Sequence, residues 1–134
     1  MVTAMTTAAF AQPAAKESPA AMGPLLREMV EVTKPASDTI FDVGRAAPTR
    51  DEDWTSMARA GVLLVESGNR LLSLAPQARD RGTWMKLSRQ MAADGQTTKK
   101  AAETRNLRSL TRASERLVVV CETCHAKYRN QILE

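Results

Sequence analysis

The two cysteines and the single histidine of this 134-residue chain fall within five consecutive positions near its C-terminal end. They form the sequence Cys121-Glu122-Thr123-Cys124-His125. On an α-helix the two thiols and the imidazole occupy neighbouring positions of one face. This spacing is typical of covalent c-type haem attachment, in which each thiol adds to a vinyl group and the imidazole ligates the iron. The motif predicts one haem c per chain, held by Cys121 and Cys124, with His125 as the iron ligand.

Three other interpretations of the cysteine pair stay open. A redox-active dithiol is expected after a strand, and no strand pattern precedes Cys121. A structural zinc site needs four ligands, whereas this cluster offers three. A disulfide between Cys121 and Cys124 would be strained, because Cβ atoms within one helical turn do not point at each other.

The histidine count also limits the second axial position of the iron. Since His125 is the only histidine of the chain, a second imidazole ligand is excluded. The sixth ligand is then a methionine, another weak donor, or absent. No methionine follows His125, so a methionine ligand would come from an upstream helix.

Composition favours helices over strands. Aromatic residues make up 4% of the chain, which has only six glycines and six prolines. Good helix formers are common, and the length suits one domain. The net charge is +4, and the basic residues are scattered among acidic ones, so a nucleic-acid partner is not expected. A membrane span is not expected either, because no apolar run approaches about 18 residues. Carboxylates are not paired with a base, which does not favour an enzyme.

The first helix is predicted over residues 24–44. It starts with Pro24, ends at Gly44, and carries apolar residues at spacings of three and four: Leu25, Met29, Val32, Ala36, Ile40 and Val43. Pro35 removes an amide donor and clashes with the preceding turn, so a kink or break is expected near residues 31–34.

Three more amphipathic helices follow. The second is expected to start at a capping box formed by Thr49 and Glu52 and to reach about Leu74, before a turn at Pro76. The third should begin near Asp80 and continue past a weak point at Gly95.

The last helix should be capped by Asn106 and carry the thiols on its apolar stripe. Four such helices predict an all-α fold, an antiparallel four-helix bundle with the haem near one end.

The first 22 residues differ from the rest. Ala9-Phe10-Ala11 fits the pattern of a signal-peptidase site, and residues 12–22 carry two prolines. We expect residues 1–22 to be a leader remnant and linker and residues 23–134 to be the haem domain. The alternative is an Ala/Thr-rich end without a targeting role. Export to the periplasm agrees with haem attachment, which takes place outside the bacterial cytoplasm.

The pattern Cys-x-x-Cys-His-x-x-Tyr-Arg close to the C-terminus resembles the class II c-type cytochromes, the cytochrome c-prime family. The resemblance implies that Tyr128 packs beside the haem and that Arg129 shields or polarises the proximal imidazole. It also implies a residue of the first helix over the iron, for which Met29 is the candidate. The alternative candidates for that position are the first-helix residues Leu25, Val32 and Ala36. A homodimer through the first two helices is a further implication.

Two functions follow from these expectations. The first is single-electron transfer with redox partner proteins in the periplasm. The second is binding of a small gas such as NO or CO at a five-coordinate iron, for scavenging, storage or sensing. Strong sixth ligation would favour the first, and fast gas binding would favour the second.

Overall fold

The computed structural model describes residues 23–75 and 80–132, with side chains up to Arg129. Within these residues all regular secondary structure is helical, and no strand is formed. This confirms the all-α class expected from the composition. The expected leader and the expected turn at Pro76 lie outside the described residues.

The first helix is interrupted, as Pro35 predicts. An α-helical start, α1 (Pro24–Glu28), passes into a π-helical turn, η2 (Met29–Thr33). The α-helix resumes as α2 (Lys34–Phe41) and ends in a short 3₁₀ turn, η3 (Asp42–Gly44). The interruption begins two residues earlier than expected, because the missing Pro35 amide affects carbonyl groups in the turn before it.

Helix α3 (Asp51–Ser73) begins within two residues of its expected start, but the predicted capping pair is wrong. Asp53, and not Glu52, receives the backbone amides: Oδ2 accepts from the amides of Arg50 at 3.0 Å and Thr49 at 3.2 Å. Arg50 is the N-cap residue, so the third helical position falls on Asp53. The predicted pair, Thr49 and Glu52, therefore lies one residue before the pair that caps the helix.

Helices α4 (Arg81–Glu103) and α5 (Leu107–Ile132) match their predictions closely. Helix α4 continues through Gly95. The Asn106 side chain caps α5, since its Oδ1 accepts from the amide of Ser109 at 3.0 Å.

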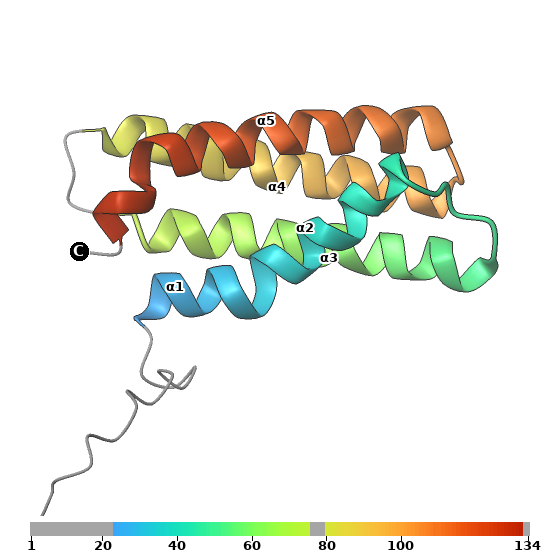
Figure 1. The fold of residues 1–134 in the computed structure, drawn as a ribbon, viewed down its shortest axis with the longest axis horizontal. Coiled ribbons are helices and arrows are strands. Elements are labelled where there is room, and N and C mark those ends of the chain that lie inside the picture. The colour runs from blue at the N-terminus through green and yellow to red at the C-terminus, as the bar shows by residue number, and fades with distance from the viewer. Residues whose placement is uncertain (1–22, 76–79, 133–134) are drawn as a thin grey trace, which may run out of the picture.

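The four helices pack against one another, and each reverses the direction of the one before it (Figure 1). Helices α3 and α4 share the most extensive contact, followed by α4 with α5 and α2 with α3. Helix α5 contacts the first helix mainly through α2 and η3. The first helix and α5 therefore meet at one end and separate toward α1 and the C-terminal half of α5 (Figure 1).

Glycines allow α3 and α4 to approach closely. A Cβ atom at Gly95 would lie 2.7 Å from the carbonyl oxygen of Gly61 and 2.8 Å from the amide nitrogen of Val65. A Cβ at Gly68 would lie 2.7 Å from the carbonyl oxygen of Ser88. Real Cβ atoms do not approach backbone atoms so closely, so these positions accept only glycine at this helix separation.

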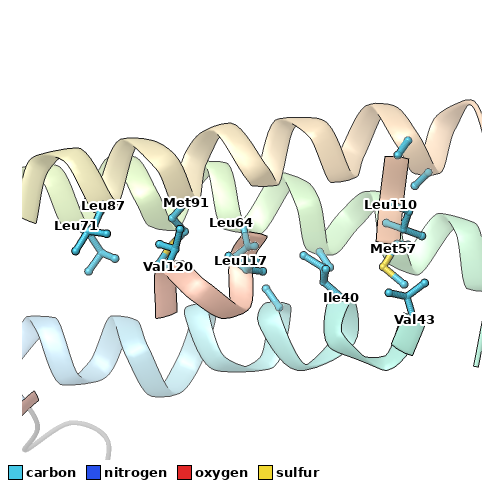
Figure 2. Packing of buried hydrophobic residues seen from close by; sticks show 14 of the residues in the cluster. Ile40, Val43, Met57, Leu64, Leu71, Leu87, Met91, Leu110, Leu117 and Val120 are labelled. Atoms are coloured by element: carbon cyan, nitrogen blue, oxygen red, sulfur yellow. The ribbon is translucent and has the colours of Figure 1, made fainter. Parts of the chain in front are cut away.

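The core lies along the axis between the helices (Figure 2). Ile40, Leu64, Leu110 and Leu117 have no exposed surface and come from three different helices, α2, α3 and α5. Figure 2 shows their side chains pointing into the same interior together with Met57, Met91 and Val120. This core fixes the helices and leaves the α1 end for the site described next.

Candidate functional site

A cavity of about 680 Å³ lies where the first helix and α5 separate. Its walls come from α1, η2 and α2 on one side and from the C-terminal half of α5 on the other. Leu71 of α3 and Trp84 and Met91 of α4 complete the lining. The volume falls within the range of roughly 300–1,000 Å³ that is usual for cofactor and ligand sites.

All six residues singled out from the sequence line this one cavity. They come from two helices that are far apart in the chain: Met29, Cys121, Cys124, His125, Tyr128 and Arg129. Helix α5 supplies five of them, because residues three and four apart on a helix share a face. Met29 faces the same space from the first helix.

The two thiols are free and half-buried, and both pack against the hydrophobic core. Burial raises the pKa of Cys121 to about 11, the neighbouring Cys124 adds to this increase, and the Ser37 hydroxyl opposes it. Burial also raises the pKa of Cys124. Both groups are therefore neutral thiols at physiological pH, whereas reactive redox cysteines have lowered pKa values.

His125 and Arg129 lie at the exposed rim of the cavity, while Tyr128 is buried. The Tyr128 hydroxyl donates to the carbonyl oxygen of Asp80 at 2.7 Å. Its ring meets Trp84 edge to face, with ring centroids 5.0 Å apart and an interplanar angle of 79°. The Trp84 indole nitrogen donates to the carbonyl oxygen of Leu71 at 2.7 Å. The aromatic end of the cavity is thus held by hydrogen bonds to two other segments.

The first helix contributes Met29 and, of the alternatives considered for the position over the iron, Leu25. Val32 and Ala36 do not line the cavity, and Ala36 faces the core. Sequence reasoning followed the usual α-helical stripe, which here leads into the core.

Two hydroxyl residues of the cavity wall, Thr33 and Ser37, were missed by that reasoning. Together with Leu25, Met29 and Phe41 they recur every four residues. This spacing of four was the signal that could have found them.

A carboxylate that sequence reasoning also missed is buried near the thiols. Asp94 is 3% exposed, and its Oδ1 accepts from Nε of Arg116 at 2.9 Å. Burial raises the pKa of Asp94, and the Arg116 guanidinium opposes this increase. Its charge is close enough to raise the pKa of Cys121 as well.

The residues of the cavity fit a haem. Its lining is mainly apolar and aromatic, as a porphyrin ring requires, and both thiols and the imidazole belong to one turn of α5. Lys34 and Arg129 also line the cavity and are cations that could pair with the carboxylates of a haem. Sequence reasoning did not identify Lys34, whose Nζ lies 2.5 Å from Oδ2 of Asp38, another lining residue.

Within the described ranges, no three His, Cys, Asp or Glu side chains come together as ligands for a bare metal ion. A haem iron needs only one or two protein ligands, because the porphyrin supplies the other four.

None of the helices described is long and apolar enough to cross a membrane.

No protein-family model, curated protein or solved structure matches this chain.

Proposed function

We propose that this protein is a c-type cytochrome with one haem c per chain, similar to the class II cytochromes, and that it carries single electrons. In this proposal the helices form an antiparallel four-helix bundle with the haem near one end. The observation that carries the proposal is the shared cavity. Cys121, Cys124 and His125 line it from α5, and Met29 lines it from the first helix.

Each group of residues has a distinct part. Cys121 and Cys124 hold the cofactor by thioether bonds, and His125 ligates the iron from the α5 side. A bound haem supplies the one-electron Fe(III)/Fe(II) couple. The apolar lining excludes water from the ring and thereby stabilises the less charged ferrous state relative to the ferric state. Tyr128 packs beside the ring, and Arg129 lies next to the proximal imidazole.

The cellular setting is also a proposal. The leader-like residues 1–22 support export to the periplasm, where soluble redox proteins would be the partners. The net charge of +4 favours acidic ones. The family resemblance supports a homodimer through the first two helices. No enzymatic reaction is proposed.

Gas binding at a five-coordinate iron is the second candidate, and one observation favours it. Met29 packs against the hydrophobic core while it lines the cavity. If the Met29 side chain keeps that core contact with haem bound, the sixth position stays open. The first helix then supplies no iron ligand and only lines the cavity, where Thr33 and Ser37 carry hydroxyl groups.

Absorption spectra of the ferric and ferrous protein, with and without CO, separate the two functions. Met29→Leu is the informative variant and Met91→Leu its matched control, because both methionines line the cavity. Electron transfer with methionine ligation predicts a low-spin spectrum with a sulfur-to-iron charge-transfer band that only Met29→Leu abolishes. A high-spin ferric spectrum and rapid CO binding in the unmodified protein would contradict methionine ligation and support gas binding.

A further inference from the structure

The first helix leaves α-helical geometry at the cavity. Residues Met29–Thr33 form a π-helical turn, after which the amide of Lys34 donates to the carbonyl oxygen of Met29, five residues back. Pro35 follows directly and has no amide hydrogen to continue an α-helical ladder. Such π turns are rare and occur most often at functional sites.

The π turn keeps one series of side chains on the cavity wall. Leu25, Met29, Thr33, Ser37 and Phe41 are spaced by four, and all five line the cavity. In a regular α-helix each step of four goes about 40° beyond a full turn, so four steps would wind the series through about 160°. A π turn contains more residues per turn, so a step of four residues falls short of a full turn there. It therefore reverses part of the rotation accumulated in the α-helical segments.

A buried hydrogen-bond relay ties the π turn to α3. The Thr33 hydroxyl donates to the carbonyl oxygen of Glu28 at 3.2 Å, five residues back, and its oxygen lies 2.6 Å from the hydroxyl oxygen of Ser67. Because Thr33 has one hydroxyl hydrogen, Ser67 is the donor in the second bond. Thr33 is 2% exposed and Ser67 is fully buried, so water does not compete for these groups.

An ion pair to the same helix supports this segment at its other end. Oε2 of Glu28 lies 3.1 Å from Nε of Arg70 on α3, and the Glu28 side chain is 6% exposed. Thr33 and Glu28 therefore attach both ends of the π turn to the same neighbouring helix.

We infer that Thr33 and Ser67 are positioning residues, whose hydrogen bonds hold the π turn and so determine which side chains of the first helix face the iron. Neither needs to touch the iron. The inference rests on the proposed function for its cofactor, and it assigns the geometry of the sixth coordination position to two hydroxyl groups.

The test uses the haem-loaded protein and four variants. Thr33→Val removes the donor and acceptor while keeping the shape, Thr33→Ser keeps the hydroxyl, and Ser67→Ala removes only one bond. Thr39→Val is the matched control, since the exposed Thr39 hydroxyl donates to the Pro35 carbonyl oxygen on the same helix. The readouts are the ferric absorption spectrum and the rate constant for CO binding to the ferrous protein.

We expect Thr33→Val to change the ferric absorption bands that depend on the sixth ligand. It should also shift the rate constant for CO binding about tenfold, or about 1.4 kcal/mol in barrier height. Ser67→Ala should move both readouts in the same direction by less, and Thr33→Ser and Thr39→Val should leave them unchanged. The inference is overturned if Thr33→Val matches Thr39→Val in both readouts. If Thr33→Val does not fold, Ser67→Ala is compared with Thr39→Val instead, and equal values in both readouts overturn the inference.

Covalent haem in the unmodified protein is measured first, which separates the two levels of proposal. If haem is present and the variants behave alike, the positioning inference fails and the cytochrome proposal stands. If haem is absent, the cytochrome proposal fails, and amide hydrogen exchange of residues 29–34 tests the hydroxyl relay. Faster exchange in Thr33→Val than in Thr39→Val then supports the relay, and equal exchange overturns it.

Discussion

The thiols of Cys121 and Cys124 are unsuited to redox exchange in their buried setting. Thiol–disulfide exchange requires a thiolate, and catalytic cysteines have pKa values lowered by nearby positive charge. Here burial raises the pKa of both thiols, that of Cys121 to about 11. At the residue scale, the site therefore favours a structural attachment role over a redox dithiol.

Alkylation of haem-free protein measures this property. With a pKa of about 11 in place of 9.0, the thiolate fraction of Cys121 at pH 8 is roughly a hundredfold lower than that of an ordinary thiol. We predict slow modification by iodoacetamide at pH 8, with a rate that rises about tenfold per pH unit toward pH 11. The denatured protein is the control and should react near its ordinary rate. A rate in folded protein that already levels off below pH 8 would contradict the assignment.

His125→Ala separates attachment from ligation. The variant keeps both thiols, so we expect it to retain covalent haem, while the ferric and ferrous spectra lose the signature of an imidazole ligand. Intact mass and absorption spectra check the two parts of this prediction. The cytochrome proposal does not survive an unchanged spectrum in the variant.

At the scale of elements, three glycines permit the close contact of α3 and α4. We predict that Gly95→Ala destabilises the fold by about 1–3 kcal/mol, because its Cβ would lie 2.7 Å from the Gly61 carbonyl oxygen and force the helices apart. Gly82→Ala, in the same helix, is the control: a Cβ there meets nothing within 4 Å. It should be neutral or stabilising by up to about 1 kcal/mol.

Urea denaturation of both variants gives the free energies of unfolding that this comparison needs. Equal stability of Gly95→Ala and Gly82→Ala would show that the two helices are not held at this separation.

Sequence patterns predicted the extents of the helices well and the contacts between them less well. Periodicity and caps placed α4 and α5 to within a few residues, since the Asn106 cap and the apolar stripes are local signals. The same patterns did not show that Gly95 permits the close approach of α3 and α4; Gly95 was interpreted as a weak point in a helix. The cause lies in α3, whose Gly61 backbone approaches Gly95, and no local pattern shows that contact.

The site shows the same division. A contiguous motif singled out Cys121, Cys124 and His125, and the apolar stripe of the first helix singled out Met29; all four line the cavity. Thr33 was missed because the α-helical period was applied through the segment preceding Pro35. A π turn changes that period, and the partner that stabilises it, Ser67, lies on another helix.

At the scale of the whole molecule, the bundle is closed at one end and open at the other. The end near η3 is filled by apolar side chains, whereas α1 and the C-terminal half of α5 border the cavity. In the proposed holoprotein one cofactor links the first helix to the last. Because the proposed haem stays attached to the unfolded chain, it would stabilise the folded state through the apolar surface that it buries in the cavity.

The intact mass of protein produced in a host that attaches c-type haem shows whether the cofactor is covalently bound. We predict a mass equal to the polypeptide plus one haem, stable to denaturation, for the unmodified chain. A double variant, Cys121→Ser with Cys124→Ser, should show the mass of the bare polypeptide. If the unmodified chain, folded and obtained from the same host, also has the bare polypeptide mass, the haem proposal is wrong.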